Sequence, residues 1–187
     1  MLKQINRVNE INVFDLRQTH KKYWRQCEIK KDSVIGDNAT WKYTDDDGET
    51  VLCRIFDYFD TPYDQCTDYW TMTSGTLIEK QCTWYQKFVE QYPTLNTNLH
   101  YNEFRQSIKP HQVNKLGCGK AQCFLHYVAL GSDISYTQSD EHKIMHEPGT
   151  LFLVGGEQKM ITSDINIFLT VSITQSFEDT VNIIQDA

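Results

Sequence analysis

The stretch Gln122-Cys123-Phe124-Leu125-His126-Tyr127-Val128-Ala129-Leu130 is a short, almost uninterrupted apolar run that ends at Gly131-Ser132. The same arrangement of a short run and a turn recurs through the second half of the chain. The other runs are Leu99–Phe104, Ile134–Tyr136, Lys143–His146, Thr150–Val154, Lys159–Thr162 and Ile165–Ile173. Short strands joined by tight turns, with no helical pattern between them, predict an antiparallel sandwich or barrel and not a parallel βαβ sheet.

The part of the chain before Pro93 has a mixed pattern. Apolar residues at spacings of three and four predict a helix over Ser74–Tyr92, and Gln18–Gln26 is typical of a shorter one. Two β-rich runs flank Asp45-Asp46-Asp47-Gly48, which predicts a hairpin with a solvated turn there. We therefore expect an α+β fold, mainly an antiparallel β jelly roll (double-stranded β-helix), backed by one or two N-terminal helices. Residues 1–187 form one predicted domain, with a mixed portion over 1–93 and a barrel portion over 94–187.

Composition limits the function before any motif is considered. The 187 residues are 40% hydrophobic, with a formal net charge of -7 and no Lys/Arg cluster beyond short pairs. The core is therefore of ordinary size, and binding to the phosphate backbone of a nucleic acid is not expected. The N-terminus is polar and no run approaches the roughly 20 apolar residues of a membrane span. We expect a soluble protein of the cytoplasm, or of a virion if the source is viral, with a homo-oligomer possible and its six cysteines reduced.

The segment Glu147–Gln158 carries the one family-like motif. A Pro148-Gly149 turn leads into the apolar run Thr150–Val154, and Gly155-Gly156 forms a second turn. This order resembles the second motif of cupins and of the 2-oxoglutarate/Fe(II) oxygenases, in which a metal-binding histidine opens the next strand. The resemblance implies a double-stranded β-helix with a divalent metal such as iron. The position of the distal histidine is occupied here by Gln158.

The rest of the oxygenase pattern also departs from the family. An iron facial triad needs two imidazoles and one carboxylate, which leave three positions open for co-substrate and oxygen. No histidine is followed two residues later by Asp or Glu, and the nearest match is His100-Tyr101-Asn102. The run Ile165–Ile173 also lacks the arginine that would hold 2-oxoglutarate in the family. The resemblance therefore implies the fold together with a degenerate metal triad.

Other histidines and carboxylates offer a cupin-like alternative. His126, His142 or His146 can combine with Glu147 or Glu157, and His142 and His146 would share one face of a strand. His126 lies inside a very apolar run, so its burial would demand a partner. The predicted metal ligands are His126, His146, His100 and Glu157. A cysteine nucleophile is a weaker alternative, with Cys118 between two glycines and His111 or His126 as its base.

Two functions remain open at this level. The first is a cupin-like or oxygenase-like β-barrel protein that binds a small molecule or metal and is catalytically degenerate. The second is a non-enzymatic structural or assembly protein, such as a viral or phage component, that uses the jelly roll as a scaffold. Jelly rolls serve both uses, so the fold does not decide between them.

Overall fold

Two antiparallel β-sheets form the centre of the computed structural model, which describes residues 1–7, 11–30, 40–44, 49–54, 69–105, 111–113, 121–163 and 165–185. Within these residues, the larger sheet has eight strands in the order β1-β10-β7-β12-β5-β4-β3-β2, and the smaller has four in the order β6-β11-β8-β9. The strands are β1 Leu2–Arg7, β2 Thr40–Thr44, β3 Glu49–Arg54, β4 Tyr69–Ser74, β5 Thr97–Arg105, β6 His111–Gln112, β7 Cys123–Leu130, β8 Tyr136–Gln138, β9 Lys143–Met145, β10 Thr150–Gly155, β11 Lys159–Ile161 and β12 Asn166–Ile173.

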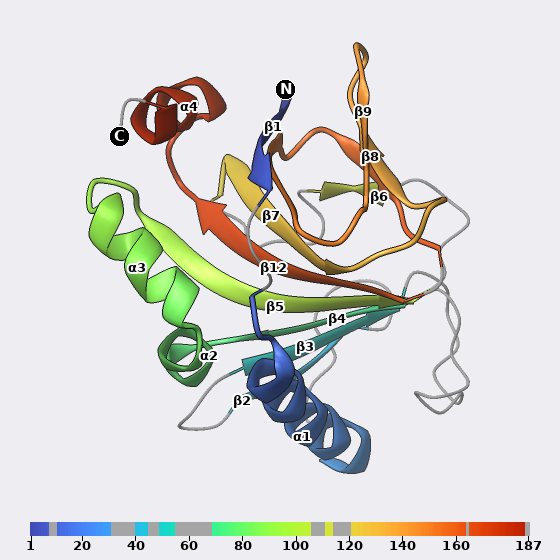
Figure 1. The fold of residues 1–187 in the computed structure, drawn as a ribbon. Helices are drawn as coiled ribbons and strands as arrows, with labels where there is room; N and C mark the ends of the chain where they lie inside the picture. Colours follow the sequence, from blue (N-terminus) through green and yellow to red (C-terminus); the bar gives the residue numbers. More distant parts are fainter. Residues whose placement is uncertain are drawn as a thin grey trace.

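The strands after Pro93 cross between the two sheets, except that β8 and β9 pair within the smaller one, and this is the arrangement of a jelly roll. β5, β7, β10 and β12 belong to the larger sheet, whereas β6, β8, β9 and β11 form the smaller one (Figure 1). β12 lies centrally and pairs antiparallel with β5 on one side and with β7 on the other. The predicted fold class, an α+β protein built mainly from an antiparallel jelly roll, is confirmed.

The central strands are buried on both faces because both faces are covered. All eight residues of β12 are buried. Its side chains alternate, so that Val171 packs among the helices while Phe168 faces the smaller sheet. We call the side toward the helices the outer face of the larger sheet, and the side toward the smaller sheet its inner face. Each large apolar side chain buried in this way contributes about 1.5–3 kcal/mol to the stability of the fold.

The helix predicted over Ser74–Tyr92 is two helices, α2 (Thr76–Gln81) and α3 (Thr83–Gln91), and that part of the prediction was wrong. Ser74 ends β4, and Gly75 adopts a positive φ of 122° before α2 begins. Cys82 is extended between the helices, and its N–H bonds the carbonyl of Glu79. The break lets both helices turn apolar side chains onto the outer face, where Ile78, Tyr85 and Phe88 are buried.

Two further helices cover the larger sheet. α1 (Phe14–Lys30) contains the predicted Gln18–Gln26 segment but is longer, and α4 (Phe177–Gln185) was not predicted. Figure 1 shows α2 and α3 running beside β5, on the side of the sheet away from β8 and β9. None of the helices in the described ranges is both long and apolar enough to cross a membrane.

The N-terminal half extends the larger sheet at both edges. The predicted hairpin is confirmed as β2 and β3, which pair from Thr40↔Cys53 to Thr44↔Glu49, while its Asp-rich turn lies outside the described residues. β3 pairs with β4 and β4 with β5. β1 adds to β10 at the opposite edge and was missed because its sequence is mostly polar. The strand predicted over Ile134–Tyr136 starts only at Tyr136, and Ile134 is exposed.

Candidate functional site in the barrel interior

A row of side chains crosses four strands on the inner face of the larger sheet. Register pairs Phe152 on β10 with His126 on β7, then His126 with Thr170 on β12, and Thr170 with His100 on β5. Residues paired directly across strands point to the same face. β12 separates the two histidines by two strand spacings, about 10 Å. The row therefore places His126 and His100 in the same interior, but too far apart to contact the same atom of a ligand.

His126 is a buried imidazole in an aromatic surrounding. It is 3% exposed, and its ring lies 5.4 Å from Phe152, 5.2 Å from Phe168 and 6.3 Å from Phe124 between centroids. Its Nδ1 has no hydrogen-bond partner among the described residues. Burial, and to a smaller extent the neighbouring His146, lower the pKa of His126 from 6.5 to about 3. The side chain is thus neutral at physiological pH, and the burial expected from its apolar run is present.

His146 is also fully buried, and hydrogen bonds hold its ring at both nitrogens. Nε2 lies 2.8 Å from the hydroxyl of Thr137, and Nδ1 lies 3.2 Å from Oδ1 of Asn166. The Asn166 amide nitrogen donates to the carbonyl of Ser163 at 2.9 Å, which directs its oxygen toward Nδ1. Nδ1 therefore carries the proton, and the Thr137 hydroxyl donates to Nε2. This arrangement leaves no ring nitrogen of His146 with a lone pair directed at a ligand.

The local backbone fixes the position of His146. It directly follows β9, and its N–H bonds the carbonyl of Ser135 at 2.9 Å. Gly131, after β7, packs against the backbone carbonyl of His146 so closely that a β-carbon there would clash. The ring of His146 stands edge-on to that of Phe168, with centroids 4.8 Å apart, and lies parallel to that of Phe152. This packing brings His146 beside His126, although the two residues come from different sheets.

His100 and Asn102 form a polar stripe between β5 and β12. Nε2 of His100 lies 3.0 Å from the hydroxyl of Ser172, and the Asn102 amide donates to Thr170 at 2.9 Å. Burial lowers the pKa of His100 from 6.5 to about 4. The two residues share the inner face, as the His-x-Asn spacing predicts. One partner of each is a hydroxyl group of the neighbouring strand, β12.

The candidates near the second motif lie away from this interior. Glu157 is in the turn after β10, with its side chain about half exposed, and its Oε1 accepts a hydrogen bond from Gln158 and lies 3.9 Å from the amino group of Met1. Glu147 and His142 are exposed. His142 precedes β9 in a loop, so the prediction that it shares a face with the buried His146 was wrong. The structure brings His126, His146 and His100 into one interior and leaves Glu157 outside it.

The described donor set does not fit an iron facial triad. No group of three or more His, Cys, Asp or Glu side chains that would hold a metal is present in the described ranges. Around His126 the described polar groups are an imidazole, amides and hydroxyls, whereas iron oxygenases require a carboxylate. We therefore derive no chemical step through iron. A metal at His126, His146, His100 and Glu157 stays a prediction.

The described part of the chain does not test the predicted cysteine nucleophile. Cys118 and the side chain of His111 lie outside it. Cys82 and Cys123 are free thiols in the core, and burial raises the pKa of both. A raised pKa keeps a thiol protonated and unreactive.

Comparisons with known proteins found a distant structural similarity to two kinds of oxygenase. No family model matches the sequence, and no curated protein of similar sequence was found. Two structures of the ribosomal oxygenase YcfD from Escherichia coli are similar to this chain, with 9% and 10% identity and TM-scores of 0.40 and 0.43. The matches cover 75% and 97% of this chain but only 41% and 50% of the two YcfD chains. This chain therefore spans at most about half the length of YcfD. An oxidoreductase of the 2OG-Fe(II) oxygenase family from Burkholderia pseudomallei has 10% identity and a TM-score of 0.36, covering 91% of this chain and 95% of its own.

A second polar cluster, on the outer face beneath α1, was not predicted. His20 is fully buried, with Nδ1 2.6 Å from the hydroxyl of Thr73 and Nε2 2.8 Å from that of Thr71. Its ring lies 4.8 Å from that of Tyr101. Burial lowers the pKa of His20 to about 4, against an opposing effect of Glu103. One signal was available, because His20 follows the buried Leu16 by four residues and so lies on the same helix face.

Glu103 connects this cluster to α1. Its carboxylate is almost fully buried and accepts hydrogen bonds at Oε1 from the Tyr101 hydroxyl, at 2.8 Å, and from Nε of Arg17, at 3.2 Å. Its Oε2 lies 4.0 Å from Nε2 of His20. The buried carboxylate therefore has a charged partner and a neutral donor. The cluster attaches α1 to β4 and β5 by polar contacts.

Proposed function

We propose that this protein binds a small, uncharged molecule in its jelly-roll barrel through His126, without an iron triad. The observation that carries the proposal is the buried Nδ1 of His126, which has no hydrogen-bond partner among the described residues. A buried polar atom left unpaired costs about 1–3 kcal/mol. A ligand with one hydrogen-bonding group would recover that free energy on binding.

The surroundings of His126 define the class of ligand. Its pKa of about 3 keeps the ring neutral, with one nitrogen donating and the other accepting. The rings of Phe124, Phe152 and Phe168 provide apolar walls. A charged ligand would lose its hydration against these rings without compensation. A flat, mostly apolar molecule with a single polar edge fits this chemistry best.

A structural or assembly role is the second candidate, and the packing of the interior favours it. Phe104, Phe124, Phe152 and Phe168 are each 3% exposed or less on the inner face. If these rings fill the interior, His126 is a core residue with an unpaired nitrogen, and the jelly roll is a scaffold. The two candidates differ in whether any molecule occupies the barrel.

Native mass spectrometry of the purified full chain, combined with plasma mass spectrometry for metals, tests the proposal. The variants are His126→Phe, which removes the ring nitrogens, and His142→Phe, a matched change at an exposed histidine. We expect the wild type and His142→Phe to carry a small organic molecule that His126→Phe lacks. A metal in stoichiometric amount that is lost from His126→Phe would replace the proposal with a metal site. A wild type with neither would overturn it in favour of the scaffold.

A further inference from the structure

A pocket of about 580 Å³ lies on the outer face, on the opposite side of the larger sheet from His126. The segment that leads into α1 and the first turns of α1 form one wall, and β7 and β12 form the other. Its lining residues are Ile11, Asn12, Val13, Phe14, Arg17, Tyr127, Ala129, Leu130 and Ile167. The volume lies in the range of small-molecule sites, which are mostly apolar with a few directed polar groups.

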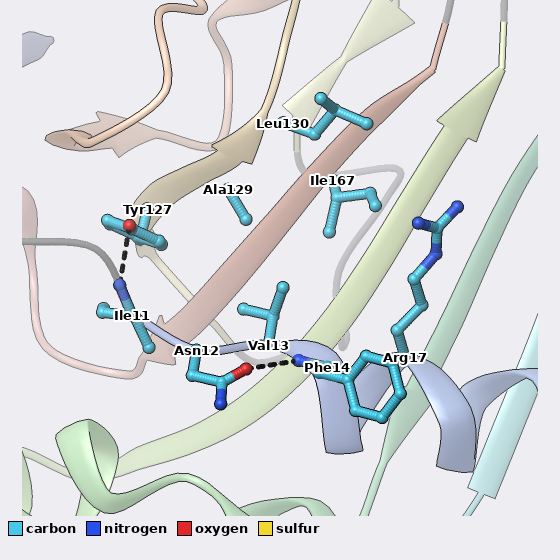
Figure 2. A pocket seen from close by; sticks show the side chains of 9 residues that line it. All are labelled: Ile11, Asn12, Val13, Phe14, Arg17, Tyr127, Ala129, Leu130 and Ile167. Carbon is cyan, nitrogen blue, oxygen red and sulfur yellow. Dashed lines mark hydrogen bonds between the residues drawn. The ribbon is translucent and has the colours of Figure 1, made fainter.

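The middle of the pocket is apolar, and its rim is exposed. Figure 2 shows Val13 and Ile167 between Tyr127 at one end and Arg17 at the other, with Ala129 on the strand side. Phe14 is 63% exposed and Leu130 is 39% exposed, which is unusual for large apolar side chains lining one pocket. An aliphatic chain laid between the two ends would cover these apolar groups.

Arg17 supplies a charged group at one end. Its Nε donates to Glu103, and its two terminal amino groups make no hydrogen bond to another described residue. The side chain is 37% exposed and lines the pocket. A guanidinium binds a carboxylate through two parallel N–H donors. Arg17 is therefore able to hold Glu103 through one nitrogen and an external acid through the others.

Tyr127 supplies a donor at the opposite end. Its hydroxyl oxygen accepts the N–H of Ile11 at 3.0 Å, so the ring position is fixed. The hydroxyl hydrogen has no acceptor among the described residues. The pocket thus has a cation at one end, an O–H donor at the other, and an apolar surface between them.

We propose that this pocket binds an aliphatic carboxylic acid, with its carboxylate on the terminal amino groups of Arg17 and its chain along Val13, Ala129 and Ile167 toward Tyr127. The proposal does not depend on a ligand in the barrel, because the two sites lie on opposite faces of the sheet. Either proposal can fail without the other.

Calorimetric titration of the full chain with octanoate, and with octanol as the uncharged probe, tests this site. Ala129→Phe adds bulk to the apolar part of the pocket and keeps the charge of Arg17, Arg17→Gln removes that charge, and Lys87→Gln on α3 is the matched control. We expect octanoate to bind the wild type and the control equally, and Ala129→Phe and Arg17→Gln about tenfold more weakly. Octanol should bind the wild type about tenfold more weakly than octanoate.

Three results would overturn the proposal: no binding of octanoate to the wild type, equal octanoate affinity in Ala129→Phe, or equal affinities for octanol and octanoate. Arg17→Gln removes the cation beside the buried Glu103, so its folding is checked by circular dichroism. If that variant does not fold, Ala129→Phe and the octanol comparison still decide the outcome.

Discussion

The two faces of the larger sheet bury histidines in different ways. On the outer face, His20 has both ring nitrogens within hydrogen-bond distance of threonine hydroxyls, beside the Glu103–Arg17 pair. On the inner face, His126 is as deeply buried but lies among phenylalanine rings, with Nδ1 unpaired by the described residues. Burial lowers the pKa of both, so burial alone does not distinguish them. The hydrogen bonds do, because threonine hydroxyls contact both ring nitrogens of His20, whereas Nδ1 of His126 has no partner among the described residues.

Acid pH should have the largest effect, and it acts on both faces. Burial lowers the pKa of His20, His100 and His126 from 6.5 to about 4, 4 and 3 in the folded protein. Between pH 6.5 and about 4 the unfolded chain binds more protons than the folded protein does. The free energy of unfolding therefore has its full value above pH 6.5 and falls as the pH drops toward 4. Each histidine should contribute on the order of 3 kcal/mol to this loss.

Urea unfolding at a series of pH values measures this loss. Stability that stays constant between pH 6.5 and 4.5 would contradict the burial of neutral imidazoles on either face.

The variant Arg17→Met should have the next largest effect, and it acts on the outer face alone. It leaves the carboxylate of Glu103 buried without its cation, a change that costs about 3 kcal/mol in buried pairs. The partial exposure of Arg17 makes this an upper value. Urea unfolding at pH 7 checks it, with the double variant Arg17→Met/Glu103→Gln as the control. If both variants are equally destabilised, the loss comes from the apolar part of Arg17 and not from a stranded charge.

The variant His20→Phe sharpens the contrast between the faces. It keeps an aromatic ring against Tyr101 but removes the nitrogens that contact Thr71 and Thr73, at a cost of about 2 kcal/mol. Thermal unfolding followed by circular dichroism measures it. A neutral effect would show that the threonine contacts do not determine the position of His20.

The variant Glu157→Gln should have the smallest effect. This carboxylate is about half exposed, and its ion pair with the N-terminus is a surface contact, so a change below about 1 kcal/mol is expected. The metal content of the variant should equal that of the wild type. A metal present in the wild type and absent from this variant would restore Glu157 as a ligand.

The β-strands were predictable because glycine and proline turns separate their apolar runs, and seven predicted runs correspond to β5 and β7–β12. β1 was missed because it is a mostly polar edge strand, and the break at Cys82 depends on how α2 and α3 pack on the sheet. Burial of His126 followed from its apolar neighbours. The hydrogen bonds of His146 were not predictable, because they depend on residues from other parts of the sequence. The exposure of Glu157 was not predictable either, because it depends on the direction of the turn after Gly155.

The contrast between the two faces is tested most directly by the free energy of unfolding of His126→Phe relative to the wild type. Both proteins are refolded to remove any ligand and are then unfolded in urea at pH 7. We expect the variant to be as stable as the wild type or more stable by about 1 kcal/mol, because it replaces an unpaired buried nitrogen with carbon. A loss of about 2 kcal/mol or more would show that both ring nitrogens of His126 have partners within the fold, as those of His20 do, and would contradict the proposed ligand-binding role of His126.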